Sequence, residues 1–181
     1  PEWLGVQVEP PEGSGALKAA ALGLVSPVPN PRFSKYSGIQ EWRNGVLLFV
    51  NVGDAKGNAY DNCFVRNGAQ LTWFAQERQT PETPVVRRLL EDEACPVHLF
   101  CRNVGDAYTY CGRLARARHW PERRPIKVLW NLLDAPALRL SDQFLSLLEL
   151  NEQEGLDPGL DDDEGGDADG KGDGDDAQVP P

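Results

Sequence analysis

Residues 96–120 read PVHLFCRNVGDAYTYCGRLARARHW, and this stretch decides the fold. An apolar run (96–102) leads into the polar pentapeptide NVGDA (103–107), and a second extended run follows (108–120). Gly and Asp between apolar runs are typical of turns, because Gly reaches backbone angles that other residues avoid. We therefore expect two antiparallel strands joined by a turn at Gly105.

The pentapeptide NVGDA occurs a second time, at 51–55, after the apolar run GVLLFVNV (45–52). A continuous apolar run of this length is typical of a strand that is buried on both faces. Neither copy is followed by the Gly-Lys-Ser/Thr of a phosphate-binding loop. We interpret both copies as turns that join strands of one sheet, at comparable ends of it, with Gly53 and Gly105 at the turns.

Further elements are expected on both sides of these strands. The segment CFV-RNGA-QLTWFAQ (63–76) predicts a hairpin around Asn67-Gly68. Residues 80–94 predict a helix that begins at Thr80-Pro81 or at Thr83-Pro84. Residues 126–134 predict a last strand, and residues 141–150 a short helix capped by Ser141. The order predicts an α+β fold: a bent, mostly antiparallel sheet or small barrel with one or two packed helices.

Charge and composition divide the chain into three parts. The last 31 residues hold 12 of the 28 Asp and Glu but one of the 18 Lys and Arg, so residues 1–150 hold 16 acidic and 17 basic residues. We expect a Pro-rich linker over 1–30, a single domain over 31–150, and a disordered acidic tail over 151–181. The tail is a candidate site for basic proteins such as histones, or a spacer.

The four Cys do not form a CxxC pair and no signal-peptide pattern precedes them, which favours buried, reduced thiols and an intracellular location, the nucleus in a eukaryotic cell. No apolar run is long enough to span a membrane. The spacing of Cys and His does not match a zinc site, and no cofactor motif is present, so we expect no metal and no cofactor. Oligomeric state is left open.

Two groups of side chains are candidates for contact with DNA or RNA. The first is a basic cluster with interleaved aromatic residues, which suits phosphate contact and base stacking. The second lies where a strand meets the start of the helix, a position that favours anions and base edges. The phosphate candidates are Arg116, Arg118, Arg123, Arg124 and Lys127. The base or pocket candidates are Trp73, Gln76, Arg78 and Tyr110.

The order of several short motifs resembles an uncharacterised domain at the C-terminus of bacterial superfamily II helicase and restriction-type proteins, with similar segments in plant and algal proteins. The resemblance covers about residues 33–137 and runs through Trp73, Gln76, Pro81, Glu82, Thr83, Arg88, Tyr108, Tyr110, Gly112, His119, Pro125 and Trp130. The stretch YTYCGRLARARHWPE is also similar to SRA domains, which flip and read modified bases, although Cys111 stands where those domains usually have Asp. Both likenesses imply a sheet-rich, PUA/SRA-like accessory domain of nucleic-acid machinery.

Together these patterns predict a non-enzymatic nucleic-acid-binding module, for DNA in the first place, that reads modified or flipped bases. The alternative is a protein-interaction module whose acidic tail binds basic partners. A hydrolase or nuclease is the third possibility, but no catalytic motif supports it.

Overall fold

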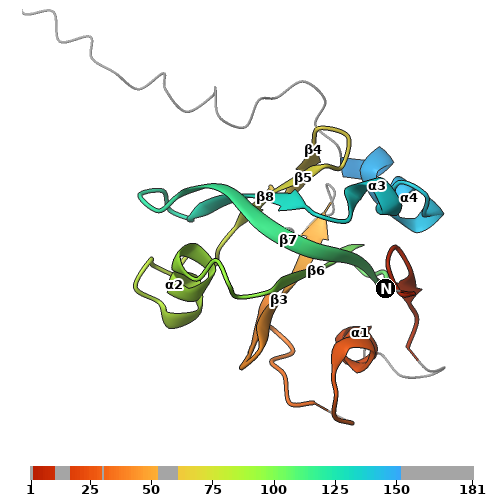
Figure 1. Cartoon of the computed structure of the whole chain (residues 1–181), viewed down its shortest axis with the longest axis horizontal. Coiled ribbons are helices and arrows are strands. Elements are labelled where there is room, and N and C mark those ends of the chain that lie inside the picture. Colours follow the sequence, from red (N-terminus) through yellow and green to blue (C-terminus); the bar gives the residue numbers. More distant parts are fainter. Residues whose placement is uncertain (1, 11–16, 30, 53–60, 152–181) are drawn as a thin grey trace, which may run out of the picture.

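The computed structural model describes residues 2–10, 17–29, 31–52 and 61–151, and Figure 1 shows their arrangement. The acidic tail over 151–181 and Gly53 of the first NVGDA copy lie outside the described residues, apart from Asn151 at the end of a helix. The elements in chain order are β1 (Gln7–Val8), α1 (Leu17–Val25), β2 (Ile39–Trp42), β3 (Gly45–Val52), β4 (Cys63–Val65), β5 (Gln70–Phe74), α2 (Pro84–Glu91), β6 (Val97–Asn103), β7 (Tyr108–Trp120), β8 (Lys127–Leu132), α3 (Ala135–Leu138) and α4 (Asp142–Asn151).

The strands form one bent, unclosed sheet in the order β2-β3-β6-β7-β8-β5-β4, with β1 paired to β7. The described pairs are antiparallel except β3 with β6, which run parallel. This confirms the predicted α+β class and the bent, mostly antiparallel sheet. The barrel alternative is not realised, because β2 and β4 remain unpaired edges of the sheet.

Strand β7 is the centre of the bend. Its first half pairs with β6 as far as Leu114, and its second half pairs with β8 from Leu114 onward. Gly112 lies just before this change, with φ of +79°, and a Cβ there would lie 2.6 Å from Asp134 Oδ2. A side chain at this position is therefore excluded by backbone angle and by space.

Strand β3 separates two parts of the core, which confirms the prediction that it is buried on both faces. Val46, Leu48 and Val50 pack in the larger cluster, which α2 and α4 cover. Leu47 and Phe49 pack on the other face with Ala21 and Leu22 of α1.

Two segments of the expected linker over 1–30 pack against the sheet. Residues 7–8 add a strand to β7, and α1 packs on the sheet through Ala21 and Leu22, which are fully buried. The short apolar fragments are enough for this because the neighbouring face of β3 already offers an apolar surface.

The predicted turn, the start of α2 and the Ser141 cap are present, but the Thr83 hydroxyl accepts the Thr80 N–H and makes no cap hydrogen bond to α2. Arg66, Asn67 and Gly68 have positive φ between β4 and β5. Helix α2 begins after Thr83, with Pro84 in its first turn, and the Ser141 hydroxyl accepts the Phe144 N–H at the start of α4.

The NVGDA copies occur at the same end of neighbouring strands, because β3 and β6 are parallel and Val52 lies beside Asn103. The second copy is a hairpin turn, with Gly105 at φ +97°. The first copy does not join adjacent strands, because the next strand, β4, lies at the far edge of the sheet.

Candidate functional site

The predicted basic cluster gathers in part at the end of the β7–β8 hairpin, residues 118–127, which we call the hairpin end. The Arg118 guanidinium lies 4.7 Å and the Lys127 ammonium 4.8 Å from the Trp120 ring centroid. The indole itself is 5% exposed and packs with Leu129 and Val65. Trp120 therefore positions two cations at the surface while its own ring stays covered.

The turn of the hairpin end carries charges of both signs. Arg124 is exposed, and its guanidinium donates to the carbonyl oxygens of Pro121 and Arg123 at 2.7 Å. Glu82, before α2, is close enough that Arg124 contributes to lowering the pKa of its carboxyl, after the larger effect of a hydrogen bond with Thr80. Neighbouring carboxylates therefore lower the positive electrostatic potential of this turn.

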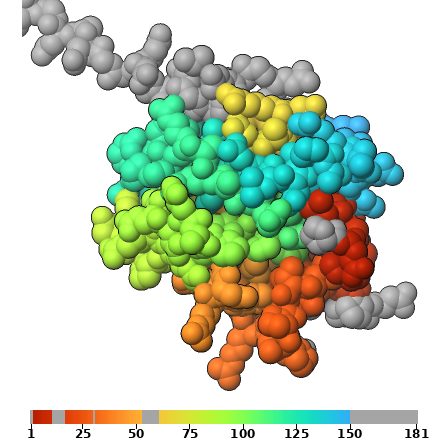
Figure 2. Space-filling view, in the orientation of Figure 1, coloured from red at the N-terminus to blue at the C-terminus, as the bar shows by residue number. Residues whose placement is uncertain are grey.

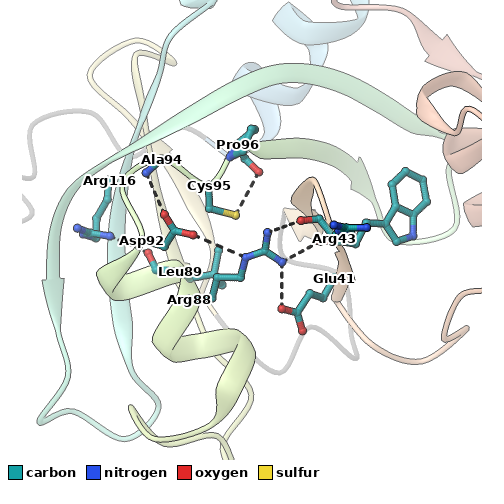
Figure 3. Close-up of polar contacts among 10 residues, drawn as sticks. Glu41, Arg43, Arg88, Leu89, Asp92, Ala94, Cys95, Pro96 and Arg116 are labelled. Carbon is teal, nitrogen blue, oxygen red and sulfur yellow. Dashed lines mark hydrogen bonds and ion pairs between the residues drawn. The ribbon is translucent and has the colours of Figure 1, made fainter.

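Arg116 has a structural role that the sequence did not indicate. Its side chain is 16% exposed and donates to the Leu89 carbonyl oxygen at 2.7 Å, near the end of α2 (Figure 3). Its second nitrogen lies 3.6 Å from the carboxylate of Glu93. We therefore omit Arg116 from the phosphate candidates, because its guanidinium joins the sheet to α2.

A second arginine holds α2 from the other side (Figure 3). Arg88 donates to Glu41 Oε1 at 3.1 Å and to the carbonyl oxygens of Trp42 and Arg43 at 2.8 and 3.0 Å. The β2–β3 turn is thereby joined to α2. Arg88, which is part of the resemblance described above, is an anchor of the fold.

Two of the base or pocket candidates are buried. Tyr110 is 4% exposed, and its hydroxyl lies 2.8 Å from Nδ1 of His98. Burial, with a smaller effect of Arg113, lowers the pKa of His98, so this pair is neutral at pH 7. Trp73 is 5% exposed and belongs to the larger core cluster. Neither ring offers a free face for base stacking.

The other two candidates, Gln76 and Arg78, are exposed on the segment between β5 and α2. This segment starts beside the hairpin end, because the Ala75 N–H donates to the Ile126 carbonyl oxygen and Phe74 pairs with Lys127. The start of this segment, next to Gln76, therefore lies beside the hairpin end. Figure 2 shows the hairpin lying against α2 on one side of the molecule.

A second cationic region was not predicted. It is formed by Lys18 of α1, Lys35 of the following segment, Arg102 of β6 and Tyr108 of β7, which we call the cationic hollow. These four residues line two adjoining cavities, of about 490 and 360 Å³. No residue pattern signals the hollow, because its members are far apart in sequence.

Lys18 is buried, with 8% of its surface exposed, and its ammonium donates to the carbonyl oxygens of Ser34, at 2.8 Å, and Ser37. It also lies 4.5 Å above the Phe49 ring. Burial, with the nearby Arg102, lowers the pKa of Lys18 to about 8.

Arg102 is held in place by several groups around the hollow. Its Nε donates to Asn51 Oδ1 at 2.9 Å, one nitrogen donates to the Asp106 carbonyl oxygen at 3.2 Å, and the guanidinium lies 4.3 Å from the Tyr108 ring. Asn51 and Asp106 come from the two NVGDA copies, so the repeat supplies part of the support for one cation.

The smaller cavity lies where the two edges of the bent sheet approach each other. It is lined from the β2–β3 side by Ile39 and Val50, and from the β4–β5 side by Asn62, Trp73 and Gln76. Two of the predicted pocket residues, Trp73 and Gln76, thus fall at the hollow. None of the described residues that line either cavity is acidic.

A third cavity, of about 490 Å³, lies beside the end of α2 and the strands β6 and β7. Its charges are already paired: Arg116 with Glu93, and Arg113 with the nearby Asp134 at 3.4 Å. It therefore offers less positive potential than the cationic hollow.

The cysteines agree with the prediction of buried thiols: Cys63, Cys95, Cys101 and Cys111 are buried and form no disulfide. Within the described ranges, no three His, Cys, Asp or Glu side chains are grouped as a metal site requires. None of the helices described is long and apolar enough to cross a membrane.

A scan against protein-family models and a search of curated proteins found no match to this chain. The resemblance to the helicase-associated domain therefore stays a prediction, and the functional argument depends on the geometry of the two cationic regions.

Proposed function

We propose that the protein is a non-enzymatic nucleic-acid-binding module whose contact surface is the hairpin end together with Gln76 and Arg78. The observation that supports this most is the arrangement of Arg118 and Lys127 around Trp120, which presents two cations from paired strands. Because the indole restricts both side chains, less conformational entropy is lost when they meet phosphate.

The shape of the hairpin end supports the same proposal. Beyond Leu114, strand β7 no longer pairs with β6, so the outer part of the hairpin has β7 as its edge. Because β8 pairs with β5 as far as Lys127, the surface offered to a nucleic acid is the β7 edge of the sheet, and an exposed Gln beside β8 suits hydrogen bonding to an adenine edge. Arg123 and Arg124 at the turn add further phosphate contacts in this arrangement.

The resemblance to an accessory domain of helicase and restriction-type proteins is consistent with this function. The proposal includes the reading of modified or flipped bases, but with fewer candidate residues than the sequence offered. The exposed Gln76 amide is its candidate, since Trp73 and Tyr110 are buried.

The test is a fluorescence-anisotropy titration of duplex and single-stranded DNA and RNA at several salt concentrations. The variant Arg118→Gln/Lys127→Gln should bind at least roughly ten-fold more weakly, and the slope of log affinity against log salt should fall by about two, because two phosphate contacts are lost. Arg87→Gln, which removes an exposed cation of α2, is the matched control and should change affinity little.

Equal affinity and equal salt slope for the double variant and the control would remove the hairpin end from the proposal. Absence of nucleic-acid binding, together with salt-sensitive binding of basic proteins that is lost on deletion of 152–181, would favour the interaction module instead.

A further inference from the structure

The cationic hollow concentrates positive charge, and no acidic residue is among the described residues that line it. Lys18, Lys35 and Arg102 reach it from α1, from the segment after α1 and from β6, and the described lining residues include no carboxylate. At the hairpin end, in contrast, acids such as Glu82 and Glu122 accompany the arginines. The hollow is therefore the stronger candidate for an anion among the described cavities.

Lys18 gives the strongest indication that an anion belongs there. A buried ammonium without a carboxylate partner is costly, and proteins retain such groups mainly at sites of function. Two of its N–H groups are used on the carbonyls of Ser34 and Ser37, which orient the ammonium without neutralising it. The pKa of Lys18 is lowered to about 8 by burial and by Arg102, so it is charged at pH 7 but sensitive to any added anion.

The surroundings fit an organic group as well as the anion. Phe49 and Tyr108 are buried and pack edge to face beneath the cations, with ring centroids 5.0 Å apart, so they form the floor of the hollow and do not offer a free ring face. Phe33, 37% exposed, lies at the larger cavity, and the Gln76 side chain lies at the smaller one. Cavities of about 490 and 360 Å³ are within the range of small-molecule sites.

The geometry points to a binding site for a phosphate monoester of nucleotide size, with the phosphoryl group between Lys18, Lys35 and Arg102 and the planar base on the aromatic and amide side of the hollow. The cations of this site differ from those of the hairpin end, although Gln76 borders both, and the site does not depend on the proposed function. The same chemistry is offered by a free nucleotide and by the 5′-phosphate end of a nucleic-acid strand.

The test is isothermal titration calorimetry of the whole chain at pH 7.5 with adenosine 5′-monophosphate, cytidine 5′-monophosphate, inorganic phosphate and adenosine. We expect both nucleotides to bind, inorganic phosphate to bind more weakly, and adenosine not to bind. A dinucleotide with and without a 5′-phosphate distinguishes the two sources: preference for the phosphorylated dinucleotide over the mononucleotide identifies a strand end. No heat with either nucleotide or dinucleotide at millimolar concentration would overturn the proposal.

Variants assign the binding to the hollow. Lys35→Gln changes an exposed side chain, so it should fold normally and weaken nucleotide binding roughly ten-fold, as expected for one charge-assisted hydrogen bond. Arg87→Gln is again the matched control and should not change it. Equal affinity of Lys35→Gln and wild type, with Lys18→Met also unchanged, would place the nucleotide elsewhere and overturn the assignment.

The pH dependence gives an independent readout. A phosphate monoester stays dianionic above pH 7.5, since its second pKa is about 6. The pKa of Lys18 is about 8, so Lys18 loses its proton in this range. Affinity should therefore fall between pH 7.5 and pH 9 in wild type and stay level in Lys18→Met. The double variant at Arg118 and Lys127 should keep nucleotide binding, so failure of either proposal can be recognised separately.

Discussion

The hairpin end and the cationic hollow differ in how the sequence assembles their charge. Five cations lie within the twelve residues 116–127 that include the hairpin end, yet Arg116 donates to α2 and Arg124 donates to the carbonyls of its own turn. In the hollow, three cations come from distant parts of the chain, and the described lining holds no acid. A high density of cations in the sequence therefore does not show how much positive charge a ligand would contact. Some of these cations make intramolecular hydrogen bonds, and others are brought together only by the fold.

The largest effect is expected at Gly112, which lies in the bend that separates the two regions. Gly112→Ala puts a Cβ at positive φ, 2.6 Å from Asp134 Oδ2, and should cost about 3 kcal/mol of unfolding free energy. Urea denaturation measures it. Gly105→Ala is the control: it also has positive φ, but nothing lies within 4 Å of a Cβ there, so a smaller loss is expected. Equal losses would show that contact with Asp134 does not matter.

The second effect tests whether the hairpin arginines have different roles. Arg116→Met removes a charge-assisted hydrogen bond at a half-buried site and should cost about 2 kcal/mol, whereas Arg118→Met should stay within about 0.5 kcal/mol. The Glu93 partner contributes little, since its side chain is 88% exposed. Urea midpoints compare the two. If Arg118→Met is the more damaging, the assignment of anchor and contact is reversed.

The third effect is the pH dependence of stability caused by Lys18. Its folded pKa, about 8, lies below its unfolded value of 10.5, so between these values the unfolded state binds more protons and stability rises with pH. Wild type should gain about 1 kcal/mol relative to Lys18→Met between pH 7.5 and pH 9. Thermal denaturation at matched ionic strength measures this. The same pH dependence of stability in both proteins would mean that folding does not lower the pKa of Lys18.

The elements that the sequence predicted are those with local causes. Asn67-Gly68, Thr83-Pro84 and Ser141 determine turns and caps through neighbouring atoms, and the apolar run at 45–52 indicates a buried strand by itself. The parallel pairing of β3 with β6 and the packing of α1 depend on distant partners. The Ala-rich sequence of α1 favours a helix, but its packing on the sheet depends on the apolar face of β3.

The candidate site follows the same division. Arg118 and Lys127 could be grouped from the sequence because they belong to one local basic cluster, and the hairpin places both beside Trp120. Lys18 and Arg102 are 84 positions apart, so their proximity is a property of the tertiary structure. The burial of Trp73 and Tyr110 was missed because aromatic residues on strands suit a core as well as a binding surface.

The most direct test of the central claim, that the hollow holds an uncompensated buried ammonium ready for an anion, is an NMR titration of the Lys18 side chain with and without adenosine 5′-monophosphate. The account predicts a pKa of about 8 in the free protein, and an increase when the nucleotide is bound. A Lys18 that titrates near its ordinary value of 10.5 and does not respond to the nucleotide would contradict it.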